Sequence, residues 1–300
     1  MPEHPDIVVC VERLQGLIVG KVVDRVRLLH PFVVRTVEPP LASVERQRVI
    51  GCERLGKRIV IGLERQLFLL VHLMLSGRLL WRRRGAEGAR RNGLLALDFP
   101  SGSLLLTESS SHKRASVHIV SGRSALREFD RGGVEPLEVT ATQFEAALRR
   151  ENRTLKRALT DPRIVSGIGN AFSDEILHQA RLSPVKHTAA LDHTEVERLH
   201  RACQTVLRQW VQRLRAEAGD GLPERVTGSH EGMAVHGRYR MPCPDCGTAI
   251  QRIRYAKNEV DYCPRCQTDG RILADRALSR LLRKDWPRSI EELEERQGKR

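Results

Sequence analysis

Hydrophobic residues in the first 130 positions follow two patterns. Over residues 7–18 they are spaced for one face of a helix. Short runs rich in leucine and β-branched residues come next, and turn signals such as Asn92-Gly93 and residues 101–103 separate some of them. The runs are residues 21–29, 58–63, 67–73, 94–99 and 104–107. This pattern is typical of a sandwich or barrel of short antiparallel strands, and we expect the sandwich.

From about residue 135 the apolar spacing becomes helical. Helices are predicted around residues 144–148, 155–159, 171–180 and 196–214. Residues 219–232 are polar and rich in glycine, which predicts a flexible loop. Residues 271–300 predict a tail with one amphipathic helix. Its apolar positions are Ile272, Leu273, Leu278, Leu281 and Leu282.

These patterns predict an α+β chain of several domains. We place an N-terminal β-sandwich at residues 1–132 and a helical domain at 133–234. A compact segment marked by cysteines follows at 235–270, and a helical extension at 271–300.

Charge is the unusual property of the composition. Lys and Arg number 51 and Asp and Glu 37, so the 300-residue chain carries a formal charge of +14. Such an excess indicates a polyanionic partner. No apolar run approaches the roughly 20 residues of a membrane helix, and the start MPEHPD does not resemble a secretory signal. We therefore expect a cytoplasmic protein, associated with the nucleoid if the polyanion is DNA.

Four of the seven cysteines form two CxxC pairs separated by 16 residues. Each pair offers two thiolates from one tight turn, and the spacer can fold as a hairpin that joins the turns. We therefore expect one structural zinc ion with a closed set of four ligands. The ligands are Cys243, Cys246, Cys263 and Cys266. The remaining Cys10, Cys52 and Cys203 lie in apolar segments and are expected to be buried free thiols.

Two further motifs carry possible chemistry. Residues 166–170 read SGIGN directly before a helical pattern, so glycines and a helix N-terminus there can approach a phosphate. The same sequence is also compatible with an ordinary helix hairpin that has a glycine turn. At the start of the chain, removal of Met1 would expose the secondary amine of Pro2 beside Glu3. Such an amine can attack a carbonyl carbon, although Pro2 also suits a purely structural helix start.

Taken in order, these motifs resemble the formamidopyrimidine-DNA glycosylase and endonuclease VIII family of DNA repair enzymes. The resemblance covers residues 2–268, about nine-tenths of the chain. The matching stretches are MPEHPDI, LGKRIVIGL, VHLMLSGRL, SGIGNAFSDEIL, and VHGRYRMPCPDC through YCPRCQ. The family implies a helix–two-turns–helix element in the helical domain and a zinc finger at its C-terminal side.

The resemblance also implies roles for single residues. Pro2 would attack the anomeric carbon of a damaged nucleotide, Glu3 would protonate the sugar ring oxygen, and Lys57 would contact the lesion's phosphate. Met74 would fill the space left by the everted nucleotide, and Asn170 would bind the DNA backbone. Further expected DNA contacts are Lys113, Arg114, Arg254, Lys257 and Asn258.

Two departures from the family pattern concern lesion choice. Asn258 stands where the family usually has an arginine that grips phosphates, and Arg252, Arg254 or Lys257 can compensate. The stretch SHKRA at residues 111–115 stands where the formamidopyrimidine branch has Arg-Arg-Phe-Gly. The alanine at its end cannot wedge into a base stack, which puts a preference for 8-oxoguanine in doubt.

The leading hypothesis is a monomeric bifunctional DNA glycosylase and abasic-site lyase of base excision repair. Its substrate would be double-stranded DNA with oxidised bases or abasic sites. A non-catalytic relative that binds damaged or abasic DNA, and a glycosylase for bulky alkylated bases, remain as alternatives. A zinc-ribbon transcription factor explains neither the β-rich half nor the MPE start.

Overall fold

The computed structural model describes residues 1–86, 92–223, 226–255, 258–274 and 287–298. The chain divides into two compact units. The first combines residues 1–131 with 208–228, and the second combines 132–207 with 229–300. The domain boundaries expected at residues 132, 234 and 270 remain predictions.

The described residues of the first unit contain a helix, eight strands and, at residues 208–218, the end of a longer helix that begins in the second unit. Helix α1 spans His4–Ile18. The strands are β1 (Arg25–Leu28), β2 (Val49–Leu55), β3 (Arg58–Leu63), β4 (Leu67–His72), β5 (Gly77–Arg82), β6 (Gly93–Phe99), β7 (Gly102–Glu108) and β8 (Ser116–Ser121). Short 3-10 helices lie between them: η1 (Pro31–Val33), η2 (Leu41–Val44), η3 (Glu64–Gln66) and η4 (Arg123–Phe129).

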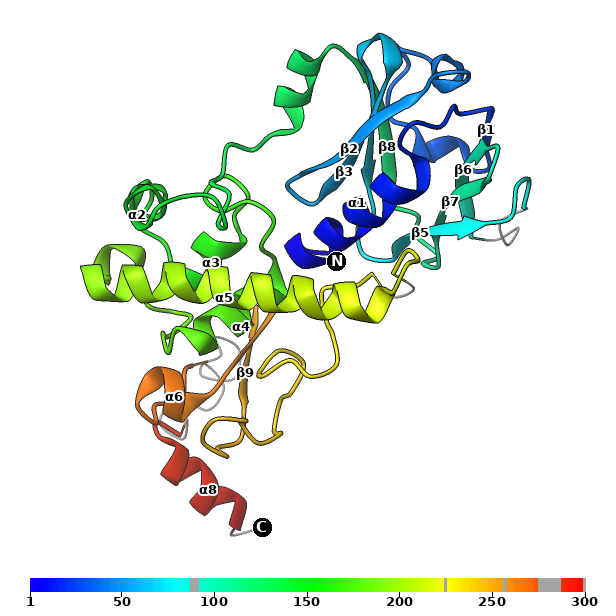
Figure 1. The fold of residues 1–300 in the computed structure, drawn as a ribbon. Coiled ribbons are helices and arrows are strands. Elements are labelled where there is room, and N and C mark those ends of the chain that lie inside the picture. Colours follow the sequence, from blue (N-terminus) through cyan, green and yellow to red (C-terminus); the bar gives the residue numbers. More distant parts are fainter. Residues whose placement is uncertain (87–91, 224–225, 256–257, 275–286, 299–300) are drawn as a thin grey trace. The chain divides into compact units, whose positions relative to one another are not determined.

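The strands form two antiparallel sheets, ordered β1-β6-β7-β5 and β2-β3-β4-β8. Side chains from both sheets share one core, to which Leu69 contributes from β4, Leu97 from β6 and Leu14 from α1. Helix α1 packs on β2 and β3, as Figure 1 shows. The predicted β-sandwich is therefore confirmed. The expected catalytic residues, Pro2, Glu3 and Lys57, lie just before α1 and in the turn between β2 and β3.

The five hydrophobic runs all contain strands, but three strands were not predicted. Strand β2 carries Gly51 and a register shift between Val49 and Gly51, which interrupts its alternation. Strand β8 has polar residues at Ser116 and His118, and in β5 only residues 79–81 are apolar, between Arg78 and Arg82. Their apolar runs are consequently too short to stand out in the sequence.

The second unit is mainly helical. Its helices are α2 (Ala141–Arg149), α3 (Leu155–Thr160), α4 (Asn170–Gln179), the 3-10 helix η5 (Thr188–Ala190), and α5 (His193–Ala218), whose last residues from 208 onward belong to the first unit. A hairpin of β9 (Gln251–Tyr255) and β10 (Asn258–Tyr262) precedes α6 (Pro264–Thr268). The four predicted helices are confirmed, with Phe144, Phe172 and Leu199 fully buried.

The C-terminal extension differs from its prediction. Leu278, Leu281 and Leu282 lie outside the described residues, and Ile272 and Leu273 are half-buried residues outside any helix. Among the described residues, the extension contains one helix, α8 (Ile290–Gly298). This helix is rich in glutamate and was not predicted from the apolar spacing. Its first residue, Ile290, is buried and donates its N–H to the carbonyl of Gly270.

Candidate functional site

The start of α1 buries its polar residues. Glu3 is the residue that precedes the helix, and its backbone N–H donates to the carboxylate of Asp6 over 2.8 Å. Pro2 is buried, and Glu3 is only 3% exposed. Gly228 packs against this segment so closely that a Cβ there would lie 3.0 Å from Glu3 Oε1. The chain thus holds Pro2 and Glu3 in one place before the first helical turn.

Lys57 lies beside this segment, in the tight turn between β2 and β3. Burial lowers the pKa of the Lys57 ammonium, against the opposing pull of the Glu3 and Asp6 carboxylates. Burial also lowers the pKa of the Met1 amino group. The Glu3 and Asp6 carboxylates act to raise this pKa, and the Lys57 ammonium acts to lower it. The structure therefore brings together the amino terminus, Glu3 and Lys57, the set that the sequence singled out for catalysis.

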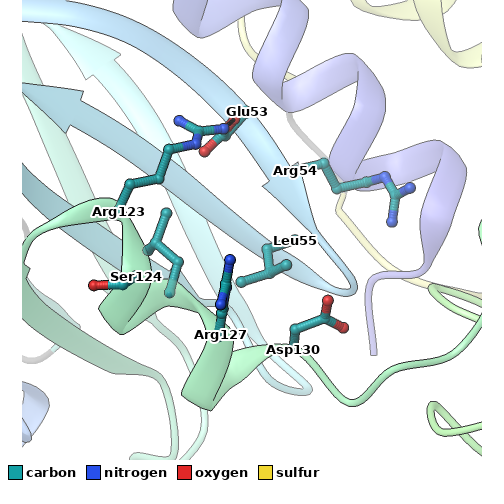
Figure 2. Close-up of a pocket in the computed structure, with 8 residues that line it drawn as sticks. Glu53, Arg54, Leu55, Arg123, Ser124, Arg127 and Asp130 are labelled. Atoms are coloured by element: carbon teal, nitrogen blue, oxygen red, sulfur yellow. Dashed lines mark hydrogen bonds and ion pairs between the residues drawn. The ribbon is translucent and has the colours of Figure 1, made fainter.

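A cavity of about 500 Å³ lies beside the hairpin that carries Lys57, between the end of β2 and η4 (Figure 2). Its charged residues are largely engaged with the protein. Arg123 forms an ion pair of 2.8 Å with Glu53, and Arg54 donates to the carbonyl of Gly56 over 2.8 Å. The second of these contacts braces the turn that presents Lys57, so we assign this cavity a structural role.

One arginine and two histidine side chains gather on the sheet next to Lys57, and none of them was assigned a role from the sequence. Arg58 begins β3, His72 ends β4, and His118 lies within β8. Burial, with the charges of Arg58 and Lys57, lowers the pKa of His72 to about 4. Among the described residues, Arg58 Nε is buried without a hydrogen-bond partner. In the sequence, only the alternation of polar and apolar residues around His118 indicates that this side chain faces away from the sandwich core.

The loop from β4 to β5 carries Met74, whose role in DNA binding stays a prediction, and the more exposed Leu75 beside it. Met74 is half-buried and has a φ of +55°, the left-handed region. Its neighbour Leu75 is 58% exposed. The N–H of Gly77 donates to the carbonyl of Leu73 over 2.9 Å, which closes the loop into a tight turn. The exposed apolar side chain of this turn is therefore Leu75.

Glu108, buried at the end of β7, organises the SHKRA stretch. Its carboxylate accepts the backbone N–H groups of Arg114 and Ala115 over 2.7 and 2.9 Å. Its carbonyl accepts the ammonium of Lys113. Arg114 is exposed, Lys113 is half-buried, and Ala115 is 2% exposed within the sandwich core. Ala115 therefore faces inward, away from any ligand.

In the second unit, Asn170 is the first residue of α4 and is half-buried. The left-handed φ of +78° at Gly167 makes the turn that precedes the helix. Lys156 donates to the Asn170 carbonyl over 2.5 Å and to the buried Asp174 carboxylate over 2.6 Å. These bonds fix the N-terminal end of α4, whose backbone N–H groups are oriented to receive an anion.

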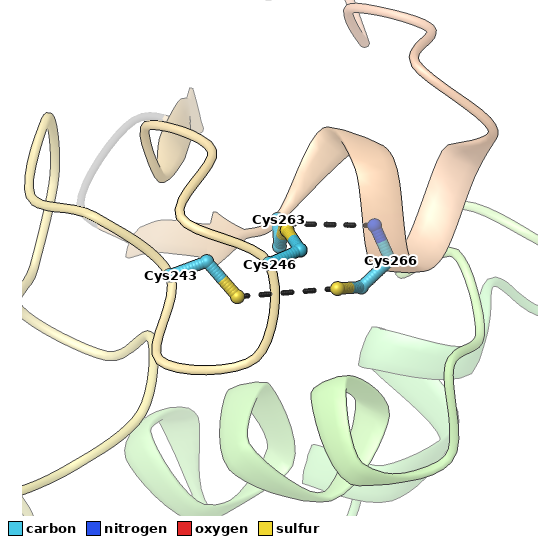
Figure 3. A group of neighbouring side chains, drawn as sticks. All are labelled: Cys243, Cys246, Cys263 and Cys266. Carbon is cyan, nitrogen blue, oxygen red and sulfur yellow. Dashed lines mark hydrogen bonds between the residues drawn. The ribbon is translucent and has the colours of Figure 1, made fainter.

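The four predicted zinc ligands converge (Figure 3). Cys243 and Cys246 lie on one loop, and Cys263 and Cys266 lie at the N-terminal end of α6. The Sγ atoms of Cys243 and Cys266 are 3.9 Å apart, and those of Cys246 and Cys263 are 3.4 Å apart. Thiolates around one tetrahedral zinc ion are about 3.8 Å apart. The donor set therefore fits a structural zinc ion, as predicted.

The hairpin of the zinc finger corrects one expectation. Arg252 forms ion pairs of 2.7 Å with Asp261 and of 2.7 Å with Glu259, so its charge is neutralised by carboxylates of the same hairpin. Arg254 pairs with Glu259 over 3.2 Å, but its side chain is 70% exposed. Lys257 lies outside the described residues. Asn258 opens β10 opposite Tyr255. Arg252 is thus unsuited to compensate for a missing arginine, whereas Arg254 remains accessible.

The three remaining cysteines are buried, as expected. Burial raises the pKa of Cys52 to about 12 and raises the pKa values of Cys10 and Cys203 further still. Thiols in this state are poor nucleophiles. Among the described residues, no helix is both long and apolar enough to span a membrane.

Three family models match the chain. Residues 1–129 match the formamidopyrimidine-DNA glycosylase N-terminal domain, and residues 133–218 match the H2TH domain of the same enzyme. Residues 242–268 match a zinc finger found in FPG and IleRS.

Curated relatives resemble the chain, one over most of its length and one over half of it. The formamidopyrimidine-DNA glycosylase of Moorella thermoacetica is 31% identical, covering 85% of this chain and 95% of the relative. An uncharacterized formamidopyrimidine-DNA glycosylase-like protein of Mycobacterium tuberculosis is 37% identical over 50% of this chain and 94% of its own length.

Solved structures show the same fold. Lactococcus lactis Fpg in complex with DNA that contains an abasic site has a TM-score of 0.79. It shares 24% identity, over 89% of this chain and 99% of that chain. The same Lactococcus protein has also been solved with DNA that contains an oxidized pyrimidine. From the family models and the relatives together, the chain belongs to the formamidopyrimidine-DNA glycosylase family.

Proposed function

We propose that this protein is a bifunctional DNA glycosylase and abasic-site lyase of base excision repair, acting through the amine of Pro2. The observation that carries the proposal is the meeting of the chain's amino terminus with Glu3 and Lys57. Removal of Met1 would leave the Pro2 amine in these surroundings. Burial there disfavours the protonated amine, so a fraction of it is free to attack at neutral pH.

The proposed reaction begins with the nucleotide outside the duplex, because a stacked base is out of reach. The Pro2 nitrogen bonds to C1′ as the bond from C1′ to the base breaks, and the base leaves with a proton. Glu3 donates a proton to the ring oxygen O4′, and the sugar opens to an iminium. The Glu3 carboxylate left by that step then takes the C2′ proton, and the electron pair of the C2′–H bond moves toward the iminium. The bond from C3′ to its phosphate oxygen then breaks, and the strand is cut.

Binding of the duplex is proposed to rest on two groups of residues. Lys57 and Arg58 in the first unit are cations that suit a phosphate, and the imidazoles of His72 and His118 beside them add neutral hydrogen-bonding groups, because burial lowers the pKa of both histidines. Asn170 and the N-terminal end of α4 suit a second phosphate. Lys113, Arg114 and Arg254 add charge. The zinc ion holds the hairpin that carries Arg254 and takes no part in the chemistry.

Borohydride trapping tests the proposal. The protein, with Met1 removal confirmed by intact mass, is incubated with duplexes that contain an abasic site, 8-oxoguanine or an oxidised pyrimidine. We expect a covalent adduct that disappears in a chain with an N-terminal extension, whose α-nitrogen is an amide, and that weakens in Pro2→Gly, whose primary amine replaces the proline ring nitrogen. Glu3→Gln should still be trapped on the abasic duplex, whose sugar already equilibrates with an open aldehyde, and should lose activity on intact damaged bases.

Absence of an adduct on the abasic duplex, from protein that has lost Met1, would overturn the proposal. If such protein still bound abasic DNA more tightly than undamaged DNA, the non-catalytic alternative would replace it.

A further inference from the structure

A buried histidine touches the zinc finger from the side of α4. His178 lies in the last turn of this helix and is 4% exposed. Its Nε2 atom is 3.3 Å from Sγ of Cys243. His178 has no part in the reaction proposed above, and the residues beside it on the helix, Ile176 and Leu177, are fully buried apolar side chains.

A polar ring in such a position costs free energy unless it has a partner. The described surroundings offer the Cys243 sulfur at hydrogen-bonding distance and the Asp245 carboxylate at 4.0 Å. A zinc-bound thiolate is a negatively charged acceptor, and a neutral imidazole with its proton on Nε2 can donate to it. The four cysteines already complete a tetrahedral set, so no coordination position remains for the histidine.

Two other residues of α4 hold the segment that leads to the first cysteine. The carboxylate of Glu175 accepts the N–H groups of Ala234, Val235 and His236 over 2.7, 2.9 and 2.9 Å. Asp174 contacts the ring of His236 over 2.8 Å. These bonds fix the backbone before the zinc finger, whereas His178 reaches a metal ligand itself.

We propose that His178 is a positioning residue that donates Nε2–H to the Cys243 thiolate and thereby ties the zinc ion to α4. The bond orients the Cys243 side chain and spreads part of the negative charge of a site with four thiolates on one Zn²⁺. Asn170 begins the same helix eight residues earlier, about 12 Å away at 1.5 Å per residue. Zinc retention and the position of the Asn170 end are then linked through one rigid helix, a consequence that rests on the proposed DNA contact.

The test measures zinc directly. His178→Phe keeps a ring of similar size without a donor, and His178→Gln keeps an N–H donor. His200→Phe is the control, because His200 is also a nearly buried helix histidine of the second unit, with Gln204 as its partner. Each full-length variant is checked for folding by circular dichroism. Zinc affinity is measured by competition with a chromogenic chelator, and the thiolate-to-cobalt charge-transfer band is recorded after Co²⁺ substitution.

We expect His178→Phe to weaken zinc binding about tenfold or more and to shift the charge-transfer band to longer wavelength, because the thiolate loses a donor. His178→Gln should recover most of the affinity, and His200→Phe should match the wild type. Equal affinity and an unshifted band in His178→Phe would overturn the proposal. So would an Nδ1–H tautomer at His178 in nitrogen NMR of the wild-type zinc protein, a readout that needs no variant. None of these outcomes bears on the lyase test.

Discussion

Replacement of Leu75 by alanine tests which of two neighbouring residues, Met74 or Leu75, fills the space left by an everted nucleotide. The sequence resemblance pointed to Met74, but the loop turns that residue half inward and leaves Leu75 58% exposed. A side chain can enter a base stack only if it is available at the surface. We therefore expect Leu75 to be the inserted residue and Met74 to support the turn.

The magnitude follows from the exposed area. Full burial of a leucine side chain contributes about 1.5–3 kcal/mol. If the exposed 58% of Leu75 becomes buried between bases, its insertion contributes about 1–2 kcal/mol. That corresponds to roughly a 5- to 30-fold loss of affinity for abasic DNA in Leu75→Ala, at about 1.4 kcal/mol per tenfold.

The assay is equilibrium binding, by fluorescence anisotropy at fixed salt, to a duplex with a stable abasic analogue and to the matching undamaged duplex. Leu75→Ala should lose affinity for the first duplex and little for the second, with an unchanged urea unfolding midpoint. Met74→Ala should lower the unfolding midpoint while it preserves the preference for the abasic duplex. The opposite assignment of these two effects would refute the reasoning from exposure and restore Met74 as the inserted residue.

Three further predictions concern stability and positioning. Glu175→Ala leaves one buried and two partly buried N–H groups without an acceptor and should cost about 2–4 kcal/mol of unfolding free energy in urea; a loss below about 1 kcal/mol would contradict this. Burial and the Arg54 charge lower the pKa of His4 to about 3. The unfolded chain thus takes up a proton below about pH 6.5 that the folded chain refuses, and stability should fall with pH toward 3 by up to about 1.4 kcal/mol per unit. His4→Leu should flatten that slope in urea titrations at several pH values, and an unchanged slope would count against the argument. Gly228→Ala places a methyl group 3.0 Å from Glu3 Oε1, and its closer contact, 2.5 Å to the Met1 carbonyl oxygen, is lost when Met1 is removed. The variant should slow base removal on the order of 10–100-fold while sparing cleavage of preformed abasic sites; equal slowing of both in single-turnover assays would argue against it.

Features that depend on local spacing were predictable. The zinc ligands follow from two CxxC turns, because each turn fixes two sulfur positions without help from the rest of the chain. Helix α4 and the first helix follow from apolar periodicity in the same way. The predicted grouping of Pro2, Glu3 and Lys57 came from the family resemblance, because no short-range pattern joins residues 2 and 57.

Other features depend on backbone angles and distant contacts. Met74 adopts a left-handed φ in the turn that leaves Leu75 exposed, and a side-chain pattern does not reveal that angle. The contact of His178 with Cys243 spans 65 residues. Arg252 reads as a free cation in the sequence, yet Asp261 neutralises it across a hairpin. The Glu108 carboxylate accepts two N–H groups of the SHKRA loop. From the sequence alone, a glutamate at the end of a strand could equally well be exposed to solvent.

The central claim is that the amine of Pro2 forms the covalent intermediate. Its most direct test is peptide mapping by mass spectrometry of the borohydride-trapped adduct with abasic DNA, after nuclease and protease digestion. The claim predicts that the sugar remnant is attached to the N-terminal peptide, which begins at Pro2, with fragment ions that place it on the first residue. A remnant on the peptide that contains Lys57, whose ammonium also has a lowered pKa, would contradict the claim and make that lysine the nucleophile.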